Sequence, residues 1–166
     1  GTRTSRQLVG IDILKTEDVL NVKKCPEKTI ARGCWLIDIH CPLGWVGTGW
    51  GSDNICSQKC QIQPPCHMKR KYHDQLVPDV FLPQDEYYDI PYGTIVSRDI
   101  DNLLAAGRCI SAEFEAVGTA RVIGTCFAIG EAAGIAASMS VQQQITVSAL
   151  NVTKLKNVML NKGIPL

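Results

Sequence analysis

Residues 101–137 read DNLLAAGRCISAEFEAVGTARVIGTCFAIGEAAGIAA, and they are the part of the chain least like an ordinary protein surface. A short apolar run ends in Ala-Ala-Gly-Arg, a polar loop follows, and the chain resumes as a segment made mostly of Gly, Ala and other small residues. Small residues remove side-chain volume. We therefore expect something else to approach this backbone closely.

The same residues predict a short buried strand at 103–106, a loop, and a long helix at 122–142. Gly124, Thr125 and Cys126 lie in the first turn of that helix, where free backbone N–H groups and the positive end of the helix dipole face outward. This arrangement suits an anion or an electron-rich carbonyl. Close packing of the helix on a sheet, without any ligand, is the alternative interpretation.

The rest of the chain predicts a mixed α/β fold. Apolar patterns indicate strands at 7–14, 34–40 and 88–96. Thr16 is expected to cap a short helix, and Ser148 is expected to cap a final helix that Gly163 closes. Between 41 and 83 the periodicity is lost and Gly, Pro, Cys, Trp and Gln dominate, which predicts a cysteine-rich loop insertion.

Composition and charge narrow the class of protein. Of the 166 residues, 45% are hydrophobic and 20% are charged, which is typical of a globular protein with its own core. The chain has 17 Lys and Arg against 16 Asp and Glu, so the balance argues against a nucleic-acid partner. The one apolar segment of membrane length, 122–141, contains Glu131 and many small residues, and we expect it to pack inside the protein instead of spanning a bilayer.

Eight cysteines fall into two groups. The first six are expected to form disulfides in an oxidising compartment, with no pairing assigned, and they are Cys25, Cys34, Cys41, Cys56, Cys60 and Cys66. Zinc held by Cys56, Cys60, Cys66 and His67 is the less favoured alternative, and no metal site is predicted. Cys109 and Cys126 are expected to be buried small hydrophobes, in preference to a redox pair.

Several motifs in order resemble the C-terminal part of FAD-dependent oxidoreductases, whose two-dinucleotide-binding-domain core is related to glutathione reductase and fumarate reductase flavoproteins. They are RTSR at 3–6 with Val9-Gly10, IARGCWLIDIH at 30–40, YDIPY at 88–92, NLLAAGR at 102–108, and TC followed by GEAAG at 125–134. The resemblance covers nearly the whole chain apart from the cysteine-rich insertion. It divides the chain into substrate-domain strands with a short helix at 1–40, the insertion at 41–83, part of an FAD-binding domain at 84–147, and a final helix at 148–166.

The resemblance implies contacts with the ribityl and phosphate region of FAD, and backbone N–H groups aimed at the pyrimidine side of the isoalloxazine, where negative charge collects on reduction. The residues placed at FAD in this way are Ala106, Gly107, Arg108, Gly124, Thr125 and Cys126. His40 is the candidate general acid or base. Arg6 and Arg121 are candidates for binding a substrate carboxylate or stabilising flavin charge, with ordinary salt bridges as the alternative.

Two departures from the family pattern and one absence affect this interpretation. The family often has Arg after Pro-Tyr, where this chain has Gly93, and the insertion between Cys41 and Pro83 is longer than the family pattern leads us to expect, so we expect substrate access to differ. No G-x-G-x-x-G turn follows an N-terminal strand, so we expect a C-terminal portion of a larger flavoprotein that needs an N-terminal FAD-binding polypeptide and acts on a small organic substrate. The alternative is an inactive flavoprotein-like fragment that serves as a cysteine-rich interaction module.

Overall fold

The computed structural model describes residues 6–37 and 82–166. Its principal elements, in chain order, are α1 (Thr16–Leu20), β1 (Thr29–Gly33), β2 (Tyr88–Pro91), α3 (Phe114–Ala120), α4 (Ile123–Gln143) and α5 (Val152–Asn161). Short 3-10 turns are η2 (Tyr92–Thr94), η3 (Gly107–Cys109) and η4 (Val147–Ala149). The described part of the chain therefore mixes helices with a small sheet, as the sequence predicts. The expected insertion falls at 41–83, of which 41–81 lie outside the described residues.

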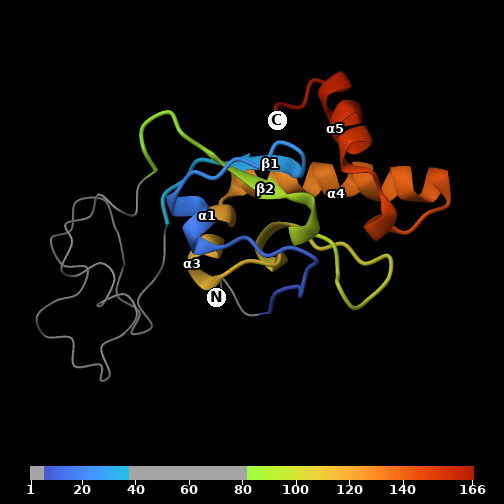
Figure 1. Cartoon of the computed structure of the whole chain (residues 1–166), viewed down its shortest axis with the longest axis horizontal. Coiled ribbons are helices and arrows are strands. Elements are labelled where there is room, and N and C mark those ends of the chain that lie inside the picture. The colour runs from blue at the N-terminus through green and yellow to red at the C-terminus, as the bar shows by residue number, and fades with distance from the viewer. Residues whose placement is uncertain (1–5, 38–81) are drawn as a thin grey trace, which may run out of the picture.

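The centre of the fold is an antiparallel pair of strands packed on one long helix. β1 pairs with β2, and Ala31 is opposite Ile90 while Gly33 is opposite Tyr88. Figure 1 shows the pair lying alongside α4, and α5 contacts both that helix and β1. Ile30, Ile90 and other apolar side chains between the sheet and the helices are fully buried, and they form one continuous core. Burial of these side chains is the main stabilising contribution to the fold.

The strands predicted at 7–14 and 103–106 are not regular strands. Residues 7–14 have no regular structure and bend at Ile11 and Asp12, and they make isolated bridges at Gly10 with Ser97 and at Leu14 with Ala112. The expected buried strand at 103–106 has a single bridge, between Leu104 and Val96, and Leu103 is 38% exposed. Both segments contain apolar residues, but each pairs with its neighbour through single bridges and not through a continuous ladder.

The strand predicted at 34–40 is wrong for residues 34–37. β1 ends at Gly33, residues 34–37 have no regular structure, and 38–40 lie outside the described residues. The strand predicted at 88–96 is correct only for Tyr88–Pro91, because the chain then enters the 3-10 turn η2. The Tyr92 N–H still donates a 2.8 Å hydrogen bond to the Lys28 carbonyl, and the turn then closes as the Ile95 N–H donates to the Tyr92 carbonyl, which ends the strand.

The long helix is predicted to within one residue, since α4 spans Ile123–Gln143. α3, in contrast, occupies residues predicted to be a loop, and six of its seven residues are buried. A helix buried on nearly all sides lacks the alternation of apolar and polar residues that reveals an amphipathic helix. The sequence therefore gives little signal for α3.

Helix ends differ from the predicted caps by a few residues. Asn151 instead of Ser148 caps α5, where its side-chain Oδ1 accepts a hydrogen bond of 3.0 Å from the backbone N–H of Lys154. Gly163 follows the last turn with φ of +78°, as the sequence predicts. Thr16 is the first residue of α1, not its cap.

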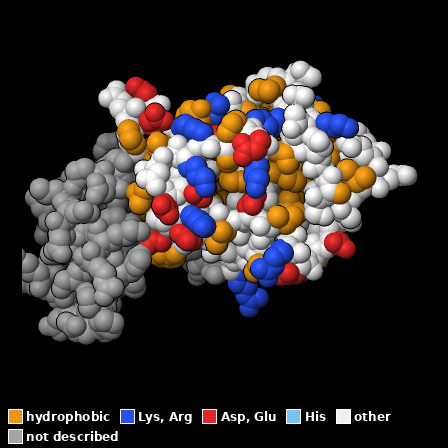
Figure 2. All heavy atoms as spheres, in the orientation of Figure 1, with side chains coloured by type: hydrophobic (Ala, Val, Ile, Leu, Met, Phe, Trp, Pro, Cys, Tyr) orange, Lys and Arg blue, Asp and Glu red, His pale blue; other side chains and the backbone are white. Residues whose placement is uncertain are grey.

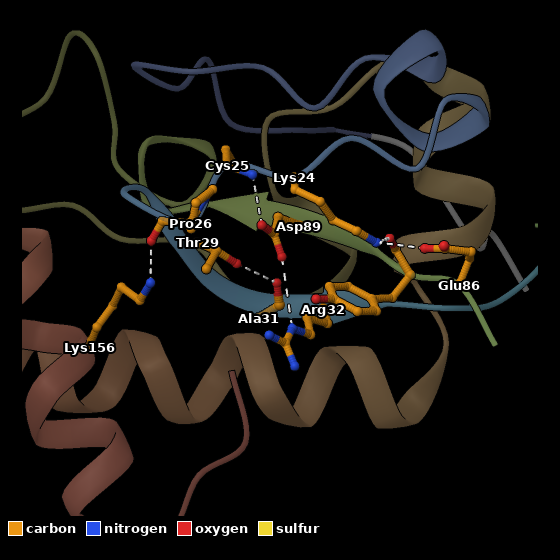
Figure 3. A network of polar contacts seen from close by, with 10 residues as sticks. Lys24, Cys25, Pro26, Thr29, Ala31, Arg32, Glu86, Asp89 and Lys156 are labelled. Atoms are coloured by element: carbon orange, nitrogen blue, oxygen red, sulfur yellow. Dashed lines mark hydrogen bonds and ion pairs between the residues drawn. The ribbon is translucent and has the colours of Figure 1, made fainter.

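A polar network ties the loop before β1 to the sheet and to α5. The buried Asp89 carboxylate accepts a 2.7 Å hydrogen bond from the Cys25 backbone N–H through Oδ2, and its Oδ1 lies 3.9 Å from Arg32 Nε (Figure 3). Lys156 Nζ donates a hydrogen bond to the Pro26 carbonyl from the other side. These contacts fix the loop over the sheet edge, away from the start of α4.

Charges of both signs lie over this side of the molecule. Figure 2 shows Lys and Arg side chains beside Asp and Glu side chains, with hydrophobic side chains between them. Among the described residues one helix, α4, is long and apolar enough to cross a bilayer by length and composition. A core helix passes the same criteria, and the side of α4 that faces β1 is buried, so this is weak evidence for a span.

Candidate functional site

The 3-10 turn η3 meets the N-terminal part of α4. Gly107 adopts φ of +68°, a backbone conformation that favours glycine, and a Cβ at this position would lie 3.6 Å from Cys126 Sγ. The next residue, Arg108, is exposed and acts electrostatically on Cys126. Burial raises the pKa of the Cys126 thiol, and the Arg108 charge opposes that rise. The structure thus brings together residues predicted from two separate motifs.

The start of α4 presents backbone donors to the surface. Its N-cap, Val122, has an extended backbone and makes no side-chain capping hydrogen bond, and the backbone N–H of Cys126 is the donor to the Val122 carbonyl. By helix geometry the preceding N–H groups, including that of Gly124, have no intrahelical acceptor. A Cβ built on Gly124 would meet nothing within 4 Å. The turn therefore combines free N–H groups, the positive end of a 21-residue helix, and open space.

Ala106 and Thr125, which are also predicted to contact FAD, differ in the exposure of their side chains. Ala106 is exposed directly before η3. Thr125 is only 6% exposed, because its side chain belongs to the face of α4 that packs into the core. Thr125 is therefore able to serve a ligand through its backbone N–H but not through its hydroxyl.

Of the three predicted catalytic residues, the structure describes the two arginines. Arg121 is the half-buried C-cap of α3, immediately before the α4 turn, and it has an interaction partner. Arg6 is exposed, and its chain segment runs beside η3, since the Leu8 N–H donates a 2.8 Å hydrogen bond to the Cys109 carbonyl. His40 lies outside the described residues. The segments of both arginines thus adjoin the same region, η3 and the start of α4.

The cysteines correct part of the sequence interpretation. Cys25 and Cys34, expected in the disulfide-bonded group, are free thiols, and Cys34 is exposed. Cys109 is exposed instead of buried, while Cys126 is partly buried as a free thiol. Burial raises the pKa of Cys25 to about 11, with the Asp89 charge as the next cause. Cys41, Cys56, Cys60, Cys66 and His67 lie outside the described residues. In the described ranges, 6–37 and 82–166, no group of three potential ligands is placed to hold a metal.

The small residues of α4 serve two different surfaces. Ala132 and Ala136 are fully buried on the side that packs on β1. Gly130 and Gly134 do not face the sheet, because a Cβ on either would meet nothing within 4 Å in the described structure. These two glycines leave the outer surface of the helix open.

Glycines that do permit close approach were missed by sequence reasoning. A Cβ at Gly10 would lie 2.7 Å from the Gly93 carbonyl oxygen, and one at Gly93 would lie 2.4 Å from Asp12 Oδ2. The Asp12 N–H also donates a 3.1 Å hydrogen bond to the Gly93 carbonyl. Nothing local in the sequence indicates these contacts, because the partners are distant along the chain.

A sequence profile of the family described as FAD dependent oxidoreductase matches residues 1–159. The chain belongs to this family, and FAD is the cofactor that the family implies. No curated protein and no solved structure matches the chain significantly. Together, the family and the mixed α/β structure indicate a flavoprotein with an oxidoreductase role.

Proposed function

We propose that this chain completes the flavin site of an FAD-dependent oxidoreductase by forming one wall of it. The observation that carries the proposal is the open, uncapped start of α4 at Gly124, next to η3 and the Arg108 charge. An electron-rich edge of a cofactor fits backbone N–H groups at a helix N-terminus, and a glycine there leaves room for it. The residues present therefore fit FAD.

Each part of the wall has a distinct role in this proposal. Gly124, Thr125 and Cys126 offer backbone N–H groups to the pyrimidine side of the isoalloxazine, where they favour negative charge. Ala106, Gly107 and Arg108 line the ribityl and phosphate region, and the positive φ of Gly107 turns the chain there without a side chain. FAD, when bound, supplies the hydride or electron-pair chemistry.

In this proposal two arginines whose chain segments adjoin the wall bind the substrate. Arg121 and Arg6 bind the anionic part of a small organic substrate, and Arg keeps its charge even when it is enclosed. His40 acts as the general acid or base. The sequence contains no G-x-G-x-x-G motif, so in this proposal an additional polypeptide region with such a turn supplies the pyrophosphate cradle.

The substitution Gly124→Glu in the complete flavoprotein tests the flavin wall. A carboxylate there fills the open space and repels an electron-rich edge, so we expect FAD binding at least about tenfold weaker, which corresponds to about 1.4 kcal/mol. Gln142→Glu is the matched control, because it adds the same charge at an exposed site near the other end of α4. FAD content is measured by flavin absorbance.

Two results would contradict the proposal. Wild-type FAD content in Gly124→Glu would show that this turn faces elsewhere. A colourless wild-type flavoprotein that takes up no added FAD would instead favour the inactive, cysteine-rich interaction module.

A further inference from the structure

The chain contains one Asn-x-Ser/Thr sequence, at Asn151-Val152-Thr153. This tripeptide is the acceptor for an N-linked sugar chain when its middle residue is not proline. We infer that Asn151 is an N-glycosylation site and that the complete protein carries a sugar chain at the start of α5. The inference goes beyond the proposed function, and none of the residues assigned to the flavin wall lies in α5.

Asn151 and Thr153 lie at the surface, as this modification requires. Both residues are exposed, whereas Leu150, directly before them, is 5% exposed and Leu155 is fully buried. The buried residues anchor α5 in the core, and Figure 1 shows this helix at the edge of the molecule. A sugar chain on Asn151 therefore extends into solvent and displaces no core side chain.

The side-chain amide of Asn151 uses only one of its two polar atoms in the fold. Oδ1 accepts a 3.0 Å hydrogen bond from the backbone N–H of Lys154 and caps α5. Because a backbone N–H can only donate, the oxygen has to face it, and Nδ2 has no hydrogen-bond partner among the described residues. Nδ2 is the atom that receives the sugar. The cap and the modification thus use different atoms.

The reaction leaves the cap intact. A bond forms between Nδ2 and the anomeric carbon of the sugar, and the bond from that carbon to the diphosphate of a lipid-linked oligosaccharide breaks. The lipid diphosphate leaves with the bonding electrons, and it takes up the proton that Nδ2 loses. The product is still an amide, so its Oδ1 continues to accept the hydrogen bond from Lys154.

The fold does not account for the hydroxyl group of Thr153. This hydroxyl makes no hydrogen bond within the part of the chain that the structure describes. Threonine is also a weaker helix former than alanine, because its branched Cβ loses rotamer freedom in a helix. The hydroxyl is the group that the acceptor sequence requires. Asn157 and Val158 repeat the first two residues in the same helix, but Met159 follows them, so the chain supplies its own negative control.

N-linked sugars are added to chains that enter the oxidising secretory route. Eight cysteines in 166 residues, three of them within 56–66, favour that route. The exposed free thiols of Cys34 and Cys109 favour a reducing compartment instead. The state of Asn151 therefore also decides between these two compartments.

Enzymatic release of N-linked sugars in heavy-oxygen water tests the inference at the residue itself. Peptide-N-glycosidase converts each glycosylated Asn to Asp and introduces the heavy oxygen there. In the complete protein from its native source, we expect peptide mass spectrometry to find the label at Asn151 and not at Asn157, which is also exposed. An unlabelled Asn151, or equal labelling of Asn157, would overturn the inference.

Three substitutions separate the sugar from the cap. Thr153→Ala removes the hydroxyl, Thr153→Ser keeps it, and Asn151→Asp keeps a capping oxygen without Nδ2. We expect the shift in intact mass on glycosidase treatment to be lost in Thr153→Ala and Asn151→Asp and retained in Thr153→Ser. All three changes are at exposed positions, so unchanged unfolding midpoints confirm that the variants fold. A shift that persists in Asn151→Asp would place the sugar elsewhere and refute the assignment.

Discussion

The ring of Tyr88 occupies the space that a side chain at Gly33 would need. The two residues are paired across β1 and β2, and a Cβ at position 33 would lie 2.2 Å from both Cζ and Oη of the ring. Tyr88 is completely buried, and its Oη is hydrogen-bonded to Thr119 Oγ1 at 3.1 Å. Burial raises the pKa of Tyr88, so the ring stays neutral at physiological pH. Gly33 is therefore what allows β2 to connect with α3.

The substitution Gly33→Ala should destabilise the chain. The added methyl group displaces a buried ring that is held by a hydrogen bond, and overpacking of this kind costs about 1–3 kcal/mol. Urea unfolding of the flavin-free protein measures the change. Gly124→Ala is the control, because a Cβ at that helical position meets nothing within 4 Å. Equal stability of Gly33→Ala and the wild type would mean that the ring moves freely.

The close contact between Gly93 and Asp12 gives a second prediction. A Cβ at Gly93 would lie 2.4 Å from Asp12 Oδ2 and 2.9 Å from the Asp12 backbone nitrogen. Gly93→Ala should therefore cost about 1–3 kcal/mol of unfolding free energy. In an Asp12→Ala background the cost should be smaller but not zero, because the backbone nitrogen remains.

The contact between Gly93 and Asp12 lies at the position where the family often has an arginine after Pro-Tyr. In this chain the Asp12 carboxylate lies where a side chain at position 93 would begin. A double-mutant cycle over Gly93→Ala and Asp12→Ala measures the coupling. Additive changes in unfolding free energy would contradict it.

Sequence patterns predicted the local features of this fold better than the distant contacts. α4 was placed to within one residue, because small and apolar residues run unbroken over its length. The meeting of η3 with the start of α4 followed from two motifs and an expected strand–loop–helix order, although the strand proved to be a single bridge. Gly33 gave no signal, since its partner Tyr88 is far along the chain.

Capping of α5 by Asn151 gives a matched pair of asparagine substitutions. Asn151→Ala removes the acceptor for the Lys154 N–H and should lower the unfolding free energy by about 1 kcal/mol. Asn157→Ala lies within the same helix at an exposed position and should be neutral or slightly stabilising, because alanine favours a helix. Urea unfolding of both variants compares them. A larger loss from Asn157→Ala would contradict the assignment of the cap.

The free cysteines should differ in their reactivity with iodoacetamide. Only the thiolate reacts. With its pKa raised from 9.0 to about 11, Cys25 is protonated at pH 8, and its thiolate fraction is about a hundredfold lower than that of an ordinary thiol. Cys34 and Cys109 are exposed, so we expect both to be labelled well before Cys25.

The pH profile separates a raised pKa from simple shielding of Cys25. Its labelling rate should increase about tenfold per pH unit between pH 8 and pH 10, because the thiolate fraction grows tenfold per unit below the pKa. The rate should level off only near pH 11, where the raised pKa places the midpoint. Peptide mass spectrometry follows each cysteine separately. A plateau of the Cys25 rate near pH 9 would show that burial beside Asp89 leaves its pKa unchanged.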